Sequence, residues 1–564
     1  MNPSPMTELQ TGDTRHILTF VIEDYFQVGA FNAVIPRSHW HRFESRLIAN
    51  TRTILKMLAD TDNTATFFCC GWVAENYPEL LREVMEAGHE IACQTYYPTP
   101  ISEFTPASLS RELQHSKEAF VGATGFLPNG FRVGRGWIAP DQLWVLDCLA
   151  QAGFDYDSSI VAIGRQFARQ PEFAQLGEHD TPSGRLIYEV PVSSMNIAGI
   201  GLPIAGGNYF RQPPESFIRK QVERWVNDHN APLVAYFHVW EIDESQPAID
   251  AAHWLQRIRH YRNLGDMKGR IQNFLARYRF SSIAENLKLE LKEASVGSSS
   301  HSVPTSKTEA LPLMHEKMDM TIAVPCYNEE ATLPYLNKAL EVFSQEFSAL
   351  YQLSYVFVDD GSKDKTLDKL QEYFGDRQEC SIVQHPENRG IAAGILTAIE
   401  NSPSELVTIL DADCTFDPMQ LPKMSAMLSD DVDMVAASPL HPEGEMVNVP
   451  GWRLLMSKGA AFLYRRVLRH KFSSYTSCFR IYRRSSVLPM QLLDHGFCGV
   501  TEIFVRMDMN GAKIVECPAV LETRLLGQSK INTLKTIAEH LRLVARVFVA
   551  RLLKRPLPLP ELTR

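Results

Sequence analysis

The sequence predicts an α/β protein built from two units. Apolar runs of strand length alternate with longer segments of helical periodicity along the chain, an order that favours largely parallel sheets. With 564 residues, the chain is too long for one hydrophobic core. A Ser-rich, Pro-containing stretch without periodicity separates the units. The expected divisions are a first domain at 15–290, a flexible linker at 291–318, a second domain at 319–530 and a C-terminal helix and tail at 531–564.

Composition and charge exclude several classes of protein. The formal net charge of −10 gives no support to nucleic-acid binding. The ten cysteines are scattered and include no CxxC pair, which favours reduced thiols over a disulfide framework or a zinc site. The polar N-terminus lacks an apolar stretch like that of a signal peptide, and no run of 18 uncharged apolar residues occurs. We therefore expect a cytoplasmic protein without a membrane-spanning helix.

The predicted strands of the second unit end in polar residues. VPCYNEE (324–330) ends in Asn328, Glu329 and Glu330, VFVDDGSKDKT (356–366) carries Asp359 and Asp360, and TILDADC (408–414) carries Asp411 and Asp413. In an open α/β sheet, sites form where the parallel strands end. Because residues i and i+2 of an extended segment point the same way, Asp411 and Asp413 can converge on one hard cation, which could bridge the phosphates of a nucleotide diphosphate.

The second half resembles a family 2 glycosyltransferase of GT-A fold, in the branch of dolichol-phosphate mannosyltransferase and bacterial polyprenyl-phosphate glycosyltransferases. The resemblance is carried by VPCYNEE, VDDGSKDKT, NRGIAAGI, DADCTFDP, YTSCFRIYRR and RLLGQSK, which span the unit. It implies a Rossmann-like nucleotide-binding domain with a UDP- or GDP-linked sugar as donor, a polyprenyl-phosphate or polysaccharide as acceptor, and a Mg²⁺ or Mn²⁺ ion held by Asp411 and Asp413.

The same resemblance implies roles for further residues. Asp360, together with Asp359, is expected to hold the base and ribose, and Arg480 is expected to bind phosphate and to act in catalysis. The residues expected to bind substrate are Pro325, Asn328, Glu330, Asp359, Asp360, Arg389, Gly390, Arg524, Ser529 and Lys530.

The turn before Arg480 departs from the family pattern. The branch has an acid and a glycine around a Thr-Ser turn, and this chain has Ser474 and Cys478 in their places. The acceptor side is therefore expected to differ, or the turn to be repacked. Glu502 matches a helix position where many such enzymes place an acid, but a phosphate acceptor is already ionised and needs no strong base. A catalytic and a structural role for Glu502 both stay open.

The C-terminal segment predicts a basic amphipathic helix. Its apolar residues at helical spacing are Leu534, Ile537, Leu541, Ala545, Phe548 and Leu552, and we expect this face to pack on the catalytic domain. The Arg-rich end would also suit a membrane surface that carries anionic lipid, so peripheral association with the inner face of the cytoplasmic membrane is the alternative.

The first half resembles polysaccharide deacetylases of NodB type, in the subgroup associated with exopolysaccharide clusters and exosortase systems. The resemblance is carried by EDYFQVGAFN, ATFFCCGWVAENYPELLREVMEAGHEIA, FDYDSSI, LPIAGGNYFR and FHVWEIDESQP. It implies a distorted (β/α) barrel of seven strands. The family hydrolyses N-acetyl groups with a metal-bound water, using an Asp and two His as ligands and a second Asp as base.

The metal site implied by that resemblance is degenerate in this chain. Asp24 keeps the ligand position, but Val21 stands where the base belongs, and Gln94 and Pro98 stand where the two histidines belong. Of the later motifs, Arg132 and His238 keep their family identities. One carboxylate is too few for a catalytic zinc, which needs three protein ligands. We therefore expect no zinc in this half.

Three functions are compatible with these patterns. The first is a bacterial glycosyltransferase of envelope or exopolysaccharide synthesis fused to an inactive deacetylase-like domain, and the sequence favours it. The second is a bifunctional enzyme whose first half is an active carbohydrate N-deacetylase. The third is a non-enzymatic assembly factor, which the retained acidic strand ends of the second half argue against.

Overall fold

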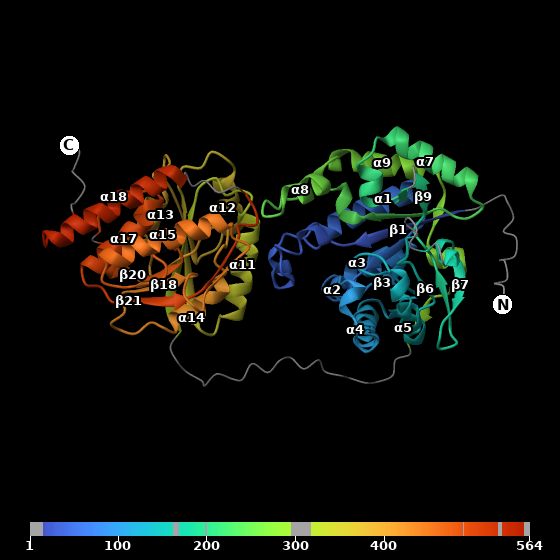
Figure 1. The fold of residues 1–564 in the computed structure, drawn as a ribbon, viewed down its shortest axis with the longest axis horizontal. Helices are drawn as coiled ribbons and strands as arrows, with labels where there is room; N and C mark the ends of the chain where they lie inside the picture. The colour runs from blue at the N-terminus through green and yellow to red at the C-terminus, as the bar shows by residue number, and fades with distance from the viewer. Residues whose placement is uncertain are drawn as a thin grey trace. The chain divides into compact units, whose positions relative to one another are not determined.

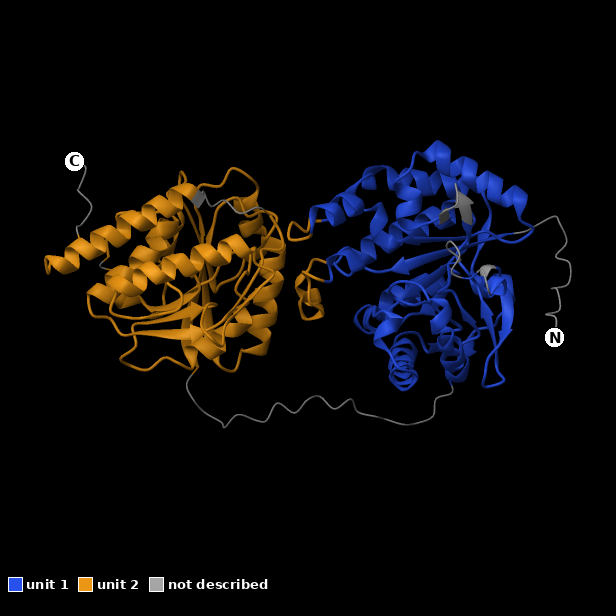
Figure 2. Cartoon of the chain, viewed as in Figure 1, with its two compact units in different colours: residues 1–32, 45–246, 253–303 blue, residues 33–44, 247–252, 304–564 orange. Residues whose placement is uncertain are grey.

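A computed structural model gives the fold of the chain (Figure 1). It divides into two compact units (Figure 2). Unit 1 comprises residues 1–32, 45–246 and 253–303, and unit 2 comprises residues 33–44, 247–252 and 304–564. Within them, the structure describes residues 15–161, 167, 170–197, 200–294, 317–488, 490–527 and 533–557.

The division differs from the predicted one at two places. Residues 33–44 and 247–252 lie within the predicted first domain, but they belong to unit 2. The predicted linker also contains a short strand, β13 (Lys292–Glu293), which pairs antiparallel with β4 (Phe126–Leu127). Residues 295–316, which make up most of that linker, lie outside the described residues. Local composition missed both features because each depends on contacts with residues far away in the sequence.

Unit 1 is built on a curled sheet of parallel strands. The strand order is β11-β1-β2-β3-β5-β6-β8-β7, with β12 off this path and paired with the first two residues of β1, and only β7 is antiparallel to its neighbour within the described sheet. Seven strands of this path run parallel, in agreement with the predicted barrel, and the described path is open between β7 and β11. The strands are β1 (His16–Ile22), β2 (Thr66–Cys69), β3 (Glu90–Cys93), β5 (Gly130–Phe131), β6 (Tyr156–Asp157), β7 (Gly177–Asp180), β8 (Leu186–Glu189), β11 (Val234–His238) and β12 (Phe280–Ser281).

Helices cover this sheet and enclose a large apolar core. Phe20, Phe67 and Phe237 of neighbouring strands pack together in that core with side chains of α1, α4 and α9. The helices are α1 (Leu47–Asp60), α2 (Gly71–Asn76), α3 (Pro78–Glu86), α4 (Pro106–Thr124), α5 (Trp144–Ala152), α6 (Gly207–Arg211), α7 (Glu215–Asp228), α8 (Trp254–Tyr261), α9 (Leu264–Arg277) and α10 (Ile283–Leu287). The 3₁₀ turns are η1 (Gly29–Phe31), η3 (Ile101–Glu103), η4 (Pro140–Gln142), η5 (Pro171–Ala174) and η6 (Val239–Ile242), and β9 (Ser194–Ile197) pairs with β10 (Ile200–Pro203).

Unit 2 is a doubly covered α/β sheet of order β16-β15-β14-β17-β20-β18-β21. Only β20 runs antiparallel within this described sheet, against β17 and β18. Each strand predicted from the second half of the sequence is present. The strands are β14 (Met318–Cys326), β15 (Tyr351–Asp359), β16 (Cys380–Gln384), β17 (Leu406–Ile409), β18 (Met434–Ser438), β20 (Arg480–Arg483) and β21 (Ile514–Pro518), and β19 (Glu445–Val447) pairs with β22 (Val520–Glu522).

Alternation along β15 places helices on both faces of this sheet. Val356 and Val358 join the core formed with α13 and α17, whereas Phe357 stacks on Phe374 of α12 with ring centroids 4.1 Å apart. The helical elements are η2 (Arg37–Arg42), α11 (Leu333–Glu346), α12 (Thr366–Phe374), α13 (Ile391–Glu400), η7 (Pro418–Gln420), α14 (Leu421–Ser425), α15 (Gly451–Val467), α16 (Arg484–Val487), α17 (Phe497–Met509) and α18 (Thr533–Leu552).

The C-terminal helix α18 packs by a different face from the predicted one. Leu543, Val547 and Ala550 are buried, and the helix lies against α15 and α17. In contrast, Leu534, Leu541, Phe548 and Leu552 of the predicted packing face are exposed. Two apolar stripes share this helix, and the spacing alone did not show which one meets the core.

No helix in the described part of the chain is long and apolar enough to span a membrane. All ten cysteines fall within the described residues, and each is a free thiol.

The glycine that precedes α13 has a backbone conformation that would be strained in any other residue. Gly390 has φ +98°, and a Cβ there would lie 2.3 Å from the backbone oxygen of His495. We expect Gly390→Ala to lower the free energy of unfolding of unit 2 by about 2–4 kcal/mol, measured by urea denaturation of the full chain. The matched control is Gly459→Ala in α15, where a Cβ meets nothing within 4 Å. That change should raise stability by about 0.5–1 kcal/mol, and equal effects of the two changes would contradict the assignment.

Candidate active site

The predicted acidic residues of unit 2 meet at one edge of its sheet. Strands β15, β14 and β17 are parallel neighbours, so their carboxyl ends lie side by side. Glu329 follows β14, Asp359 ends β15, and Asp411 and Asp413 follow β17. The backbone of Asn328 and that of Cys414 have positive φ, +52° and +51°, which turns the chain sharply after β14 and near the two aspartates.

Arg524 bridges two of these acids. Its Nη2 forms an ion pair with Oε2 of Glu329, its Nη1 lies 3.4 Å from Oδ2 of Asp413, and its Nε donates to the Leu526 carbonyl at 2.8 Å. The expected phosphate-binding arginine therefore lies among the carboxylates of the site, where it offsets their charge. A metal–diphosphate bound there would bring both a cation for the acids and an anion for Arg524.

Asp411 is the acid whose environment is least favourable to negative charge. Burial first, and then the neighbouring Asp413, raise the pKa of Asp411 to about 7, against smaller opposing effects of a hydrogen bond from the Cys478 thiol and of Arg524. Cys478, the residue in place of the family glycine, is thus the hydrogen-bond donor to this carboxylate. Carboxylate oxygens are the ligands that Mg²⁺ and Mn²⁺ prefer, so the residues present fit a hard divalent ion.

Asp359 and Asp360 have different surroundings, although they are adjacent in the sequence. Asp359 is fully buried; its Oδ1 accepts from the backbone N of Ser362 at 3.3 Å, and its Oδ2 has no hydrogen-bond partner within the described residues. Oδ1 of Asp360 lies 2.7 Å from Nδ1 of His385 and accepts from the backbone N of Arg389 at 2.9 Å, and its Oδ2 accepts from the backbone N of Gly390 at 2.8 Å.

These contacts divide the two expected roles. Both oxygens of Asp360 hold the 388–390 loop in place, so this residue positions the loop instead of contacting base or ribose as expected. Oδ2 of Asp359 is buried and has no hydrogen-bond partner within the described residues, and the expected nucleotide-binding role of this residue stays a prediction. The side chain of Arg389 is exposed on the same loop.

The loop after β14 is tied to the loop after β15. Oδ1 of Asn328 accepts from the backbone N of Lys363 at 2.7 Å, and Oε2 of Glu330 accepts from the backbone N of Lys365 at 2.9 Å. Pro325 packs near Gly394 of α13. A Cβ added at Gly394 would lie 3.2 Å from the Cβ of Pro325. These expected substrate-binding residues therefore shape the loops, and Ser529 and Lys530 lie outside the described residues.

Two residues expected to act in catalysis are buried and bonded to the protein. Arg480 is 0 % exposed, and its guanidinium donates to the carbonyls of Val500 and Tyr475 at 2.7 Å each. Glu502 is 1 % exposed and accepts from the backbone N of Asp494 at 3.0 Å and from Nε of Arg506 at 2.8 Å. The expected role of Arg480 in phosphate binding does not fit this geometry. Of the two roles left open for Glu502, the structural one fits its contacts, and both residues hold α17 and its preceding loop in place.

In unit 1, the residues of the degenerate deacetylase site are held by the protein itself. Asp24 is buried, and its Oδ1 and Oδ2 accept from the backbone N of Tyr25 at 3.1 Å and of Arg46 at 2.9 Å. Burial is the largest effect and raises the pKa of Asp24 to about 7. Val21 lies in the apolar core and pairs in register with His238.

The two vacated ligand positions are packed rather than open. Gln94 is 3 % exposed at the end of β3. Pro98 is buried against Gly134, where a Cβ would lie 2.7 Å from the Pro98 Cα. Arg132 donates to the Ser158 carbonyl and to Oγ1 of Thr19, both at 2.8 Å. No group of three or more His, Cys, Asp or Glu side chains that could hold a metal occurs among the described residues of the chain.

His238 is paired with Glu23, a residue that the sequence did not single out. Nδ1 of His238 lies 2.7 Å from Oε1 of Glu23, and Nε1 of Trp240 donates to the same oxygen at 3.0 Å. Burial acts to lower the pKa of His238, but the charge of Glu23 and its hydrogen bond outweigh it and raise that pKa. The position of Glu23, directly before Asp24 at the strand end, was the signal available in the sequence.

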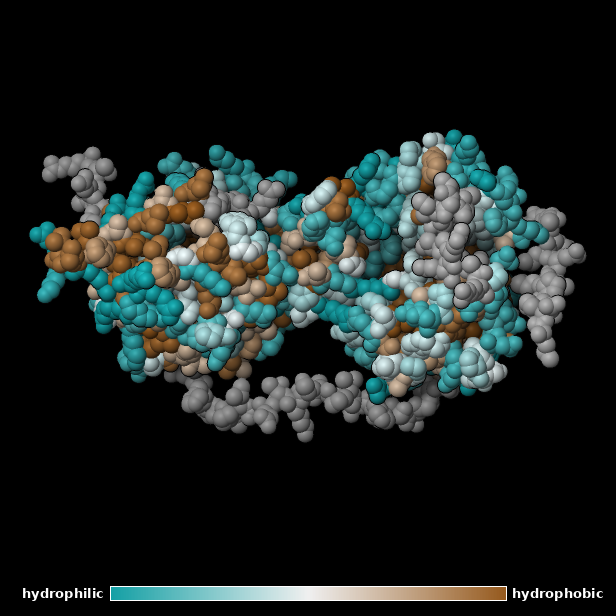
Figure 3. Space-filling view, viewed as in Figure 1, coloured by the Kyte–Doolittle hydropathy of each residue, from teal (hydrophilic) through white to brown (hydrophobic). Residues whose placement is uncertain are grey.

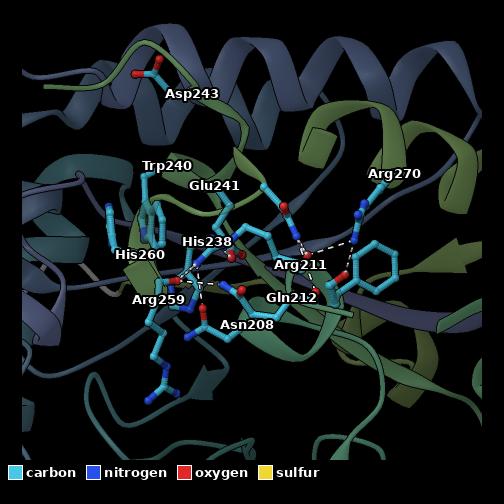
Figure 4. A network of polar contacts seen from close by, with 12 residues as sticks. Asn208, Arg211, Gln212, His238, Trp240, Glu241, Asp243, Arg259, His260 and Arg270 are labelled. Atoms are coloured by element: carbon cyan, nitrogen blue, oxygen red, sulfur yellow. Dashed lines mark hydrogen bonds and ion pairs between the residues drawn. The ribbon is translucent and has the colours of Figure 1, made fainter. Parts of the chain in front are cut away.

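A buried ion pair supports the strand end that carries His238 (Figure 4). Nη1 of Arg211 donates to Oε1 of Glu241 at 2.6 Å, and its Nη2 donates to Oδ1 of Asn208 at 2.7 Å. Oε2 of Glu241 accepts from the backbone N of His238 at 3.1 Å. Arg211 and Glu241 are each 0 % exposed, and their ion pair offsets part of the cost of burying both charges.

Family models match three stretches of the chain. Residues 38–156 match the polysaccharide deacetylase model, residues 158–288 match a domain of unknown function, DUF3473, and residues 321–488 match the glycosyl transferase family 2 model. The chain thus carries a polysaccharide deacetylase-like domain and a family 2 glycosyltransferase domain, and both predicted resemblances and the predicted fold class are confirmed.

Curated relatives match the second half. A dolichol-phosphate mannosyltransferase from Pyrococcus furiosus is 29 % identical over 234 residues, which are 41 % of this chain and 64 % of the relative. An undecaprenyl-phosphate 4-deoxy-4-formamido-L-arabinose transferase from Pseudomonas paraeruginosa is 28 % identical over 222 residues, 39 % of this chain and 62 % of the relative. The chain spans less than two thirds of these relatives. It is a fusion whose glycosyltransferase domain is related to polyprenyl-phosphate sugar transferases.

Solved structures with lower similarity match each half. A protein assigned as a polysaccharide deacetylase from Mycobacterium smegmatis has a TM-score of 0.33 and 17 % identity, with 52 % of this chain and 99 % of that chain covered. A glucosyl-3-phosphoglycerate synthase from Mycobacterium tuberculosis has a TM-score of 0.31 and 14 % identity, with 44 % and 82 % covered.

The Asp24 carboxyl group is expected to make the stability of unit 1 depend on pH. Because its pKa is raised to about 7, the folded unit keeps a proton that the unfolded chain loses near pH 4. Its stabilising contribution is therefore fully present below about pH 4 and is lost as pH rises through about 7. The free energy of unfolding of the wild type, minus that of Asp24→Asn, should fall by on the order of 2–4 kcal/mol between pH 4 and 7.5.

Urea denaturation of the full chain at several pH values measures this difference. The matched control is Asp62→Asn, which removes a carboxylate whose side chain is 93 % exposed, and it should change stability by less than about 0.5 kcal/mol. A difference for Asp24→Asn that stays constant with pH would show that Asp24 is ionised in the folded protein at pH 4 and above.

Proposed function

We propose that unit 2 transfers a sugar from a nucleotide-sugar donor to a polyprenyl-phosphate or glycan acceptor in the synthesis of a bacterial envelope polysaccharide or exopolysaccharide. The observation that carries this proposal is the meeting of Asp411, Asp413, Glu329 and Arg524 at the carboxyl edge of the sheet, in a domain that matches glycosyl transferase family 2. An arginine among acids at this edge suits a ligand that combines a cation with phosphates.

Each residue has a distinct part in the proposed reaction. Asp411 and Asp413 would hold a Mg²⁺ or Mn²⁺ ion, which when bound supplies charge stabilisation for the leaving diphosphate. Arg524 binds the phosphates of a UDP- or GDP-linked donor, since its guanidinium already reaches both sides of the acid cluster. The unpartnered Oδ2 of Asp359 accepts a hydrogen bond from the base or ribose.

The surroundings of Glu502 favour a phosphate acceptor over a sugar hydroxyl. A hydroxyl acceptor requires a base to remove its proton, whereas a polyprenyl phosphate is already ionised. Glu502 accepts hydrogen bonds from two backbone N–H groups and is paired with Arg506 at 2.6 Å, so its carboxylate is committed to the fold. The curated relatives, named for dolichol phosphate and undecaprenyl phosphate, agree with this choice.

We propose that the deacetylase-like domain does not hydrolyse N-acetyl groups by the metal route. Both carboxylate oxygens of Asp24 accept hydrogen bonds from backbone N–H groups. Val21 and Pro98 have no side-chain atom that could bind a metal or act as a base. The competing proposal, a bifunctional N-deacetylase and glycosyltransferase, requires stoichiometric metal bound through this domain. Metal analysis of the Asp413→Asn full chain, combined with an assay for acetate release from N-acetylated glycans, distinguishes the two.

An exposed apolar surface on α15 and α18 supports peripheral association with a membrane. The two helices pack together, and Tyr464 of α15 is hydrogen bonded to His540 of α18 at 2.8 Å. Figure 3 shows apolar side chains gathered over α18. We name this set the α15–α18 surface; its exposed apolar residues are Trp452, Leu455, Met456, Phe462, Leu534, Leu541, Phe548, Val549, Leu552 and Leu553.

Cationic residues border the α15–α18 surface. The guanidinium groups of Arg453 and Arg466 lie over the rings of Trp452 and Phe462, at 5.3 and 3.9 Å from the ring centroids, and Arg542 and Arg546 are exposed on α18. Apolar side chains among exposed arginines match an anionic lipid surface. We propose that this surface holds the enzyme at the inner face of the cytoplasmic membrane, where a polyprenyl-phosphate acceptor is available.

Removal of the Asp413 carboxylate tests the proposed reaction. We expect the wild-type full chain, with Mn²⁺ or Mg²⁺, to release nucleoside diphosphate from at least one UDP- or GDP-sugar, and Asp413→Asn to lower that rate by about 100-fold or more. The matched control, Asp430→Asn, changes an exposed acid outside the site and should leave the rate unchanged. Equal rates in wild type and Asp413→Asn would refute the assignment of this site.

Vesicle binding tests the α15–α18 surface. The full chain should co-sediment with vesicles of phosphatidylglycerol and phosphatidylcholine, less strongly as salt is raised. The double variant Leu455→Glu/Phe548→Glu should weaken binding by about tenfold or more, because each lost apolar side chain contributes about 1.5–3 kcal/mol when buried. The control is Leu186→Glu, at an exposed apolar residue of unit 1, and equal loss of binding in the control would contradict the proposal.

A further inference from the structure

Unit 2 contains two short segments that come from the first half of the sequence. Residues 33–44, which include η2, and residues 247–252 group with residues 304–564, whereas the residues on either side of each segment belong to unit 1 (Figure 2). A cut at the linker would therefore remove part of unit 2. The contacts of the two segments within unit 2 show what they do there.

Arg42 of the first segment is paired with an acid of the loop that holds the candidate metal ligands. Its Nη2 lies 2.8 Å from Oδ2 of Asp417, and Arg42 is 5 % exposed. Oδ1 of the same carboxylate accepts from the backbone N of Met419 at 2.9 Å and so begins η7. Asp417 follows Asp413 by four residues, so this ion pair holds the far end of the loop whose near end carries the proposed metal ligands.

Arg42 supplies the positive charge near two acids, because the histidine beside them is neutral. Ring nitrogens of His39 lie 3.7 Å from Asp417 and 3.6 Å from Glu522, but burial first and then the charge of Arg42 lower the pKa of His39 to about 4. His39 is therefore neutral at pH 7, and Arg42 supplies positive charge beside the two acids.

The ring of Phe43 packs edge-on against Tyr335 of α11, with centroids 5.0 Å apart.

The first segment is also held at its other end. Nδ2 of Asn448 donates to the Ala33 carbonyl at 2.7 Å, and Tyr335 of α11 is buried beneath the segment, with its hydroxyl 3.5 Å from Nδ1 of His39. Contacts along its whole length, from Ala33 to Phe43, therefore join the segment to unit 2.

The second segment meets the other flank of the same site. The backbone N of Asp250 donates to the Leu525 carbonyl at 2.9 Å, and Ile249, which is 0 % exposed, forms an antiparallel bridge with Leu526. Leu525 directly follows Arg524, whose guanidinium contacts Glu329 and Asp413. The backbone that carries this arginine is thus paired with residues 249 and 250.

We propose that residues 33–44 and 247–252 are positioning elements of the glycosyltransferase site. The first holds the 413–417 loop through Arg42, and the second holds the 524–526 backbone. This inference rests on the proposed function for its consequence, the ability of the site to bind a metal and a diphosphate. It assigns to the first half of the chain a task that needs none of the lost deacetylase chemistry.

Loss of Arg42 should disturb the loop because Asp417, whose side chain is only 19 % exposed, would then lose its cationic partner. In Arg42→Ala, we expect backbone amides of residues 411–420 to exchange hydrogen about tenfold faster or more in the full chain. The apparent affinity for Mn²⁺ in the presence of UDP or GDP, measured by electron paramagnetic resonance, should fall by about 10- to 100-fold, since small misplacements of ligands are costly. Arg42→Lys keeps the charge and should restore a large part of both properties.

Two further variants make the test specific. Asp417→Asn removes the charge opposite Arg42 but keeps an oxygen for the Met419 N–H, so the double variant Arg42→Ala/Asp417→Asn should be no worse than Arg42→Ala alone. Arg277→Ala is the matched control, since it deletes an equal side chain from an exposed ion pair with Glu223 at 2.8 Å in unit 1. It should change neither hydrogen exchange at 411–420 nor Mn²⁺ affinity.

The two readouts separate failure of this inference from failure of the proposed function. If exchange at 411–420 in Arg42→Ala equals that in Arg277→Ala, the positioning role is refuted, whatever the activity of the chain. If exchange rises about tenfold but the wild type binds no Mn²⁺ with either nucleotide, the positioning role stands and the proposed function is refuted.

Discussion

Negative charge gathered at one edge of a sheet is the constraint on which unit 2 depends. Glu329, Asp411 and Asp413 are brought together because the parallel neighbours β14 and β17 end there, and burial makes their repulsion costly. Two arginines offset this charge. Arg524 lies among the acids, and Arg42 is paired with Asp417 in the loop that follows them. The acids at this edge fit a divalent ion, and Arg524 offsets part of their charge.

In unit 1, the same physical requirement has the opposite outcome. Its strand ends also carry buried polar groups, and several of them are paired with other groups of the protein. Asp24 accepts from backbone N–H groups, and Arg211 is paired with Glu241, which in turn holds the backbone of His238. Such pairing lowers the free-energy cost of burying these polar groups.

The acidic residues that the motifs single out meet at one edge of the sheet, but not all of them have free side chains. Asp411 and Asp413 follow β17 in a turn, closed by a hydrogen bond from the backbone N of Cys414 to the Asp411 carbonyl at 3.0 Å, instead of in the extended segment that the sequence predicted. Three other residues also match motif positions, but their side chains are hydrogen bonded within the protein. Arg480 donates to Val500, Glu502 accepts from Asp494, and Asp360 accepts from Gly390. Such contacts depend on how loops pack, which a motif does not encode.

The sequence by itself determined the two α/β units, their families and the strand ends that carry acids, because periodicity and short motifs are written in neighbouring residues. Only the tertiary structure decided that residues 33–44 and 247–252 belong to unit 2 and that α18 buries Leu543 and Val547 while exposing Phe548. The physical reason is the same in each case. Hydrogen bonds and burial join residues that are up to several hundred positions apart, and local patterns carry no information about which of several suitable surfaces meets the core.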